Sequence, residues 1–160
     1  MPFIVLGLSA LVVLIDYILK ILVINNLKPV ASVTVIPGLF SLSYVENKGA
    51  AFGMLSNARW IFIVFTVIVV ILLVIFLFWK KPTSKLLNTA LFLIIGGGIG
   101  NLIDRIFYGY VVDYLSISFF PPVCNFADYC VTAGAFILVI YLLFFSDYVK
   151  KDKGLNDGKA

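Results

Sequence analysis

"WIFIVFTVIVVILLVIFLFW", residues 60 to 79, contains no charged residue and has a tryptophan at each end. An α-helix rises about 1.5 Å per residue, so about 20 residues cross the roughly 30 Å of hydrocarbon in a bilayer. Tryptophan rings favour the level of the lipid headgroups, which is where a spanning helix would place these two. The segment is therefore predicted to be a membrane-spanning helix.

The rest of the chain shares this apolar character. Its 160 residues are 62% hydrophobic and only 12% charged, and its mean hydropathy is +1.13. Soluble domains are about half apolar and a quarter charged. Three further segments are long and apolar enough to span a membrane, at residues 3–24, 86–107 and 129–148. The sequence thus predicts an all-α integral membrane protein with four transmembrane helices in a single domain, residues 1–149.

Lysine and arginine in the connections predict the orientation. The loop 80–85 has three lysines and the tail 150–159 has four, against four basic residues on the opposite side, namely Lys28, Lys48, Arg59 and Arg105. The positive-inside rule therefore places both termini in the cytoplasm. The first span lacks a basic start and a small-residue cleavage site, so we interpret it as a mature helix and not a signal peptide. The polar tail 150–160 is expected to be disordered.

Two connections then lie outside the cytoplasm. The first, about residues 27–58, is too long for a simple turn. Its polar and apolar residues alternate over 32–35, and Pro37 and Gly38 follow, which predicts short strands or a hairpin. We expect a small extracytoplasmic β-containing cradle on the outer leaflet. The second connection, 108–128, is interrupted by the Pro121–Pro122 pair, which predicts a re-entrant or hairpin segment.

The composition excludes several kinds of chemistry. The chain has no histidine, which removes Ser-His-Asp and Cys-His catalysis and histidine-ligated zinc. Its two cysteines are not spaced as a CxxC pair, so we expect no metal and no cofactor. The net charge of +4 comes from lysines beside the spans, with no aromatic-basic stripe, so nucleic acid is not an expected partner. Acid-base chemistry must come from carboxylates or lysine.

Ionisable residues inside the spans are costly and usually have a function. Asp16 and Lys20 lie one helical turn apart in the favourable i,i+4 order. They form either a self-neutralising pair that lets Lys20 reach outward, or the polar wall of an outward-facing site. Asn101 and Arg105 share a face of the third span, next to the glycines of 96–100, which predict close helix packing. Candidate partners for Arg105 are Asp16, a carboxylate of the outer connection and a lipid headgroup.

Asp113 and Asp128 lie at the two ends of the second outer connection, which could bring them together at one membrane depth. Alternatively, Asp128 caps the fourth helix and Asp113 is solvated. Two carboxylates about 4 Å apart at an effective dielectric near 20 repel by about 4 kcal/mol, or about three pKa units. One of them would then keep its proton near neutral pH. The charged member could take a proton from water while the neutral member polarises a peptide carbonyl, as in aspartic peptidases.

Other classes of protein remain open at this point. A proton-coupled transporter or channel would need ionisable groups at several depths, whereas nearly all of these lie at the outer side. A structural assembly subunit would need no reaction chemistry. A serine-lysine peptidase would pair Lys20 or Lys48 with Ser43 or Ser56, and no such pair lies on a recognisable motif.

The chain resembles the bacterial lipoprotein signal peptidases, the signal peptidase II family, over nearly its whole length. Four short motifs carry the resemblance, in the family's order: "DYILK" (16–20), "NKGAAFG" (47–53), "GNLIDRIFYGYVVDY" (100–114) and "NFADY" (125–129). The resemblance implies an aspartic endopeptidase of family A8 in the bacterial cell membrane, with its active site on the extracytoplasmic side. Its substrates would be diacylglyceryl-modified prolipoproteins, cut on the N-terminal side of the lipid-modified cysteine. We expect it to act as a monomer in contact with membrane lipid.

The resemblance also implies which residues form the site. Asp113 and Asp128 would be the catalytic pair, and the substrate-binding positions would be Asn47, Gly49, Asn101, Arg105, Asn125, Asp16 and Lys20. The chain departs from the family's usual pattern at Tyr17, Cys124 and Tyr129. These departures bear on the fine shape of the pocket and leave both aspartates in place.

Overall fold

The computed structural model describes residues 1–49 and 58–145. Within these residues, four apolar helices are long enough to cross a membrane, as the sequence predicts. They are α1 (Pro2–Asn26), α2 (Arg59–Lys80), α3 (Lys85–Phe107) and α4 (Phe126–Ile140), and α4 continues as a π-helical segment, Tyr141–Phe145. The last residues of the predicted fourth span, the tail 150–160 and residues 50–57 of the predicted cradle lie outside the described residues.

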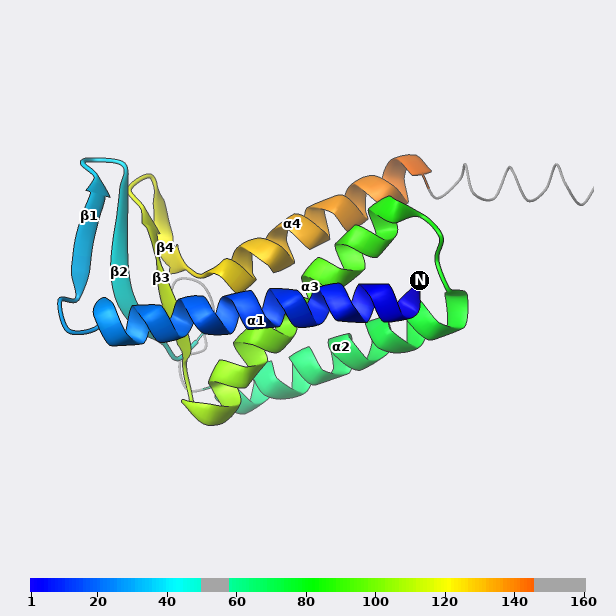
Figure 1. Cartoon of the computed structure of the whole chain (residues 1–160), viewed down its shortest axis with the longest axis horizontal. Coiled ribbons are helices and arrows are strands. Elements are labelled where there is room, and N and C mark those ends of the chain that lie inside the picture. Colours follow the sequence, from blue (N-terminus) through cyan, green and yellow to red (C-terminus); the bar gives the residue numbers. More distant parts are fainter. Residues whose placement is uncertain (50–57, 146–160) are drawn as a thin grey trace, which may run out of the picture.

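Helix α3 is the central helix of the bundle and packs against each of the other three (Figure 1). The glycines of α3, which the sequence predicts to be a packing face, explain how closely α1 and α4 approach this helix. A Cβ added at Gly96 would lie 2.7 Å from the Cβ of Val12 in α1, and one at Gly97 would lie 2.5 Å from the carbonyl oxygen of Ala127 in α4. The absence of side chains at these two glycines lets neighbouring backbones approach on two sides of α3.

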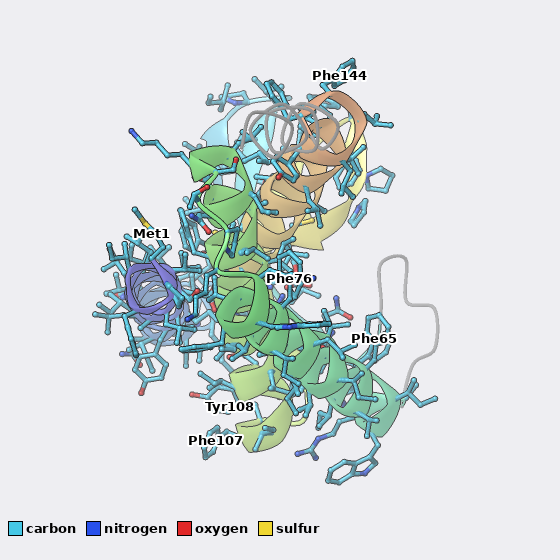
Figure 2. All side chains as sticks on the ribbon, turned by 90° about the vertical axis from the view of Figure 1, so that its right-hand side faces the viewer. Met1, Phe65, Phe76, Phe107, Tyr108 and Phe144 are labelled. Atoms are coloured by element: carbon cyan, nitrogen blue, oxygen red, sulfur yellow. The ribbon has the colours of Figure 1, made fainter. Side chains whose placement is uncertain are left out.

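The outer surface of the bundle is apolar. Figure 2 views the bundle from one end, and its labelled Phe65 and Phe144 project away from the bundle axis. These side chains are 66% and 65% exposed. In lipid, every backbone polar group must be satisfied within the protein, and helices meet that condition while presenting apolar side chains outward. The packed core lies toward the opposite end of the bundle from the sheet and includes Val5, Leu77, Leu87, Leu91 and Ile95.

A four-stranded antiparallel sheet lies across the end of the bundle that is remote from the N-terminus (Figure 1). Its strands, in spatial order, are β1 (Ser32–Ile36), β2 (Phe40–Asn47), β3 (Val111–Ile117) and β4 (Phe120–Cys124). The β1–β2 hairpin confirms the prediction for the first connection, and Gly38 takes a φ of +72° in its turn. The second connection forms the β3–β4 hairpin, and β3 pairs with β2. The two connections therefore build one sheet.

The prolines of the second connection do not make the turn. The chain reverses at Ser118 and Phe119, whereas Pro121 and Pro122 lie inside β4. Strand β4 is an edge strand, and its register with β3 shifts at this point. Proline cannot donate to a strand ladder, and an edge strand or a bulge is where it is tolerated. The predicted hairpin is therefore confirmed, whereas the expectation that the proline pair makes the break is wrong.

Candidate active site

Asp113 lies in the middle of the sheet on β3 and is 1% exposed. Two asparagine side chains hold its carboxylate. The Nδ2 of Asn47, at the end of β2, donates to Oδ2 at 2.8 Å, and the Nδ2 of Asn125 donates to Oδ1 at 2.7 Å. The backbone N–H of Gly49 donates to Oδ1 of Asn47 at 3.0 Å, which turns the amide group of Asn47 toward Asp113. The structure thus brings Asn47, Gly49 and Asn125 together around Asp113.

Asp128 lies in the first turn of α4, because this helix begins at Phe126, three residues before the predicted start of the span. Asn125 is the N-cap and forms a capping box with Asp128. The backbone N–H of Asn125 donates to Oδ2 of Asp128 at 3.1 Å, and Oδ1 of Asn125 accepts from the N–H of Asp128 at 2.9 Å. The sequence left capping and catalysis as alternatives for Asp128, and the cap fixes the position of this carboxylate without excluding the other role.

Asn125 links the two aspartates. Its side chain donates to Asp113 while its backbone N–H donates to Asp128. Burial, and then the negative charge of Asp128, raise the pKa of Asp113 to about 7, against smaller opposing effects of the hydrogen bonds from Asn47 and Asn125. Asp113 therefore carries a proton in a large share of molecules at neutral pH, as a carboxyl beside a second carboxylate should.

Asn101 of α3 joins this pair to a second cluster. Its Nδ2 donates to Oδ1 of Asp128 at 2.7 Å. Its Oδ1 accepts from Nδ2 of Asn125 at 3.1 Å and from Nζ of Lys20 at 3.0 Å. A lysine ammonium can only donate, so it fixes the amide of Asn101 with the oxygen toward Lys20 and the nitrogen toward Asp128.

Lys20 forms two ion pairs, at 2.8 Å to Oδ2 of Asp16 and at 2.9 Å to Oδ2 of Asp104. The predicted i,i+4 pair with Asp16 is present. Lys20 is only 2% exposed, however, so the interpretation in which it reaches outward is wrong. Asp104 was not among the predicted site residues, although an ionisable residue inside a span is the signal that marks it.

Arg105 has a different environment. Its Nη1 donates to the backbone oxygen of Asn101 at 3.4 Å, and its guanidinium lies 5.0 Å from the ring centroid of Phe62. Among the residues that the structure describes, it forms no ion pair, and Asp16, one of its candidate partners, pairs with Lys20. Arg105 therefore has guanidinium donors that the described residues leave available.

A groove of about 320 Å³ lies between α2 and α4, over Gly98 of α3. Its polar lining includes Asp128, Asn101 and Arg105. The other lining residues are mostly apolar: Phe62, Phe65, Thr66, Val69, Val70, Ile94, Val131 and Thr132. Cys124 and Tyr129, two of the departures from the family pattern, do not line this groove. The groove thus combines a carboxylate and a guanidinium with a wall suited to an apolar segment.

Within residues 1–49 and 58–145, the structure contains no group of three potential metal ligands. Asp113, which is buried, and Asp128, which is partly exposed, are held through one asparagine beside an apolar groove in a four-helix membrane bundle. This is the arrangement of a membrane-embedded aspartic peptidase. The bundle and the paired aspartates together thus indicate an enzyme of this kind.

Comparisons with known proteins specify the family. A family model described as signal peptidase (SPase) II matches residues 8–144. The chain is 48% identical over 135 residues to the lipoprotein signal peptidase of Caldanaerobacter subterraneus subsp. tengcongensis, covering 84% of this chain and 92% of that protein. It is 42% identical over 131 residues to the lipoprotein signal peptidase of Clostridioides difficile strain 630, covering 81% of this chain and 88% of that protein. The chain belongs to the signal peptidase II family, aspartic peptidase family A8.

Solved structures agree with this assignment. A bacterial membrane enzyme determined by the in meso method at 2.3 Å resolution superposes with a TM-score of 0.80 at 32% identity, covering 87% of each chain. A second bacterial membrane enzyme, determined by the same method at 1.9 Å, gives a TM-score of 0.79 at 31% identity, covering 89% of this chain and 94% of that one. The resemblance carried by the four motifs is therefore confirmed.

Proposed function

We propose that Asp113 and Asp128 are the catalytic pair of this signal peptidase. The protein cleaves signal peptides from prolipoproteins, the activity of its family. The observation that carries the residue assignment is the pair of hydrogen bonds from Asn125, at 2.7 Å to Asp113 and 3.1 Å to Asp128. One residue thus holds both carboxylates together.

The pair can perform hydrolysis without a covalent intermediate. The carboxylate of Asp128 takes a proton from water, and the oxygen of that water bonds to the carbonyl carbon of the scissile peptide. Asp113, whose pKa lies at about 7, gives its proton to the carbonyl oxygen. When the tetrahedral intermediate collapses, the proton on Asp128 passes to the leaving nitrogen, the C–N bond breaks, and Asp113 regains its proton.

The remaining predicted site residues have two roles in this proposal. Asn47, Asn101 and Asn125 hold the two carboxylates by hydrogen bonds, and Gly49 orients Asn47. Asp16 and Lys20, 1% and 2% exposed, act on the site through Asn101 and the backbone of α4 without reaching the substrate. Arg105 lines the groove and is the candidate for direct contact with substrate.

The groove suits the substrate that the family cleaves. A signal peptide is apolar, and the groove wall is mostly apolar along α2 and α4. Phe65 both lines the groove and is 66% exposed, so the wall continues onto the surface that faces lipid. We propose that a diacylglyceryl-modified prolipoprotein enters from the bilayer and is cut on the N-terminal side of its lipid-modified cysteine. The protein would need only membrane lipid around it and would act as a monomer.

The distribution of basic residues supports the orientation that we propose. Lys80, Lys81 and Lys85 lie at the end of the bundle opposite the sheet, where α2 connects to α3. The positive-inside rule then places that end in the cytoplasm with both termini, and the sheet with the aspartates on the extracytoplasmic side. Residues 1–149 would form the single peptidase domain.

Separate Asp113→Asn and Asp128→Asn variants test the proposal on a diacylglyceryl-modified prolipoprotein in detergent or liposomes. Each should lower the cleavage rate by about 10²- to 10⁴-fold, the usual contribution of a positioned acid or base. Glu46→Gln is the matched control, because it replaces a carboxylate by an amide at an exposed position of the same sheet, where Glu46 pairs with Lys28 and Tyr44. Near-normal cleavage by either folded aspartate variant would contradict the assignment.

A further inference from the structure

The buried triad of Asp16, Lys20 and Asp104 takes no part in the reaction steps above. We propose that the triad is a clamp that sets the relative position of the two catalytic aspartates by holding the backbone immediately before each of them. The inference rests on the proposed catalytic role of Asp113 and Asp128.

Asp104 holds the backbone before Asp113. Its Oδ2 accepts from the N–H of Val112 at 3.0 Å and pairs with Lys20 at 2.9 Å. Asp104 lies in the last turn of α3 and Val112 lies in β3, so this contact attaches the sheet to the bundle one residue away from Asp113.

Asp16 holds the backbone before Asp128. Its Oδ1 accepts from the N–H of Ala127 at 3.1 Å, while its Oδ2 pairs with Lys20 at 2.8 Å. Ala127 is the second residue of α4, and N–H groups in a first helical turn have no partner inside the helix. Asp16 thus attaches α1 to the start of α4 one residue before Asp128.

Lys20 joins the two attachments. It pairs with both carboxylates and donates to Asn101, whose side chain in turn donates to Asp128. Each aspartate of the triad uses one of its oxygens on the N–H of the residue that precedes a catalytic aspartate. Lys20 is therefore linked to Asp113 through Asp104 and to Asp128 through Asp16 and Asn101. Asn101 also accepts from Asn125, which donates to both catalytic aspartates.

Burial makes the clamp rigid. The three side chains are 1%, 2% and 4% exposed, and removing one member of a buried ion pair leaves an uncompensated charge. Stability alone would not require this arrangement, because buried ion pairs can often be replaced by apolar residues without loss. The placement of both backbone contacts beside the catalytic residues is what a positioning role requires.

The test compares Asp104→Ala, Asp104→Asn and the unchanged enzyme in steady-state cleavage of a diacylglyceryl-modified prolipoprotein. Asp104→Ala removes the acceptor for Val112 and should lower kcat about 100-fold, the order of loss expected from a misplacement of about 1 Å. Because the triad does not line the groove, KM should stay within about threefold. Asp104→Asn keeps an oxygen acceptor and should recover about tenfold of the lost kcat, since rescue by a conservative change is the mark of positioning.

Two further measurements distinguish a positioning role of the triad from a role in stability. They also test separately whether Asp113 and Asp128 are the catalytic pair. The pH profile of kcat/KM should shift in Asp104→Asn, because the coupling of the two catalytic carboxyls depends on their separation. Lys28→Gln, which breaks the exposed ion pair to Glu46, should change neither kcat nor the profile. The Asp113→Asn and Asp128→Asn variants, assayed in the same experiment, test whether these two residues are the catalytic pair.

The outcomes are distinct. A folded Asp104→Asn with unchanged kcat and an unchanged pH profile would overturn the clamp, even if the two catalytic variants are inactive. Failure of Asp104→Asn to fold, judged by size-exclusion chromatography in detergent, would also overturn it, since the triad would then serve stability. A lowered kcat, partial rescue by asparagine and a shifted profile in folded protein would support it.

Discussion

In the proposed mechanism Asp113 acts in its protonated form, although the hydrogen bonds that it accepts from two asparagines favour its charged form. The hydrogen bonds from Asn47 and Asn125 lower the pKa of Asp113, while burial and the charge of Asp128 raise it to about 7 with the larger effect. The state of this residue is thus set by opposing contributions, each of which comes from a named neighbour.

This balance predicts a pH dependence. Deprotonation of Asp113 removes the acid, so kcat/KM should fall as pH rises through about 7. Asn47→Leu removes a donor to the charged form, so it should raise the pKa of Asp113 further and move this alkaline fall to higher pH. The pH at which kcat/KM falls is measured for the unchanged enzyme and for Asn47→Leu. Glu46→Gln, on the same strand, is the control. If the fall in kcat/KM moves to lower pH in Asn47→Leu, the predicted direction of the pKa change of Asp113 is wrong.

Arg105 leads to a prediction about substrate binding. It lines the groove and forms no ion pair with the residues that the structure describes. Arg105→Gln should therefore raise KM by about tenfold or more with a smaller change in kcat, as the loss of a charge-assisted hydrogen bond does.

Arg59 supplies the matched control for this change. It also donates to a backbone oxygen of α3, at 2.8 Å to Ile106, and its guanidinium lies 5.2 Å from the ring centroid of Trp60, but it does not line the groove. Arg59→Gln should leave KM unchanged. Equal effects of the two substitutions in Michaelis kinetics would argue against substrate contact by Arg105.

At the scale of elements, the contact of α3 with α4 fixes where Asp128 lies. A methyl group at Gly97 would meet the carbonyl oxygen of Ala127 at 2.5 Å. Relieving this contact would require the backbone of α3 or α4 to shift. Gly97→Ala should therefore lower the free energy of unfolding by about 1–3 kcal/mol, the usual cost of overpacking. It should also lower activity, because α4 would move away at the residue before Asp128.

Gly7→Ala is the control for this substitution, because nothing lies within 4 Å of a Cβ added there. Alanine also favours a helix more than glycine does, so this variant should be as stable as the parent or slightly more so. Thermal unfolding in detergent and the cleavage rate measure both variants. Unchanged stability of Gly97→Ala would contradict the close contact.

The elements that the sequence predicted are those with a local signal. The spans and the β1–β2 hairpin follow from apolar length and from alternation around Pro37 and Gly38, and the structure confirms them. The pairing of β3 with β2 joins residues about 70 positions apart, and no local pattern encodes it. The position of the turn in the second connection was not predicted, because a proline pair is compatible both with a turn and with an edge strand.

The site was predictable to a similar extent. The i,i+4 spacing of Asp16 and Lys20 predicts their ion pair, because both residues belong to one helix. The pairing of Lys20 with Asp104 and the contact of Asp104 with Val112 depend on how α1, α3 and the sheet pack, which the spacing of residues along the chain does not reveal. Asp104 was therefore missed although it was visible as a costly charge in a span.

At the scale of the whole molecule, the orientation can be tested by labelling. In a background with Cys124→Ser and Cys130→Ala, a cysteine placed at Ser118, in the β3–β4 turn, should react with a membrane-impermeant thiol reagent on intact cells. A cysteine at Thr83, between α2 and α3, should react only after permeabilisation. Both positions are exposed, so access to the reagent depends on the side of the membrane. The reverse pattern would place the active site in the cytoplasm.

We propose that Asp113 and Asp128 act as one unit. The most direct measurement is the single-turnover cleavage rate of Asp113→Asn, Asp128→Asn and the double variant on one diacylglyceryl-modified prolipoprotein, at saturating enzyme. Residues that act as a unit are strongly non-additive, so each single variant should lose about as much as the double variant. Single losses that multiply to give the loss of the double variant would show that the two aspartates act independently and would contradict the account.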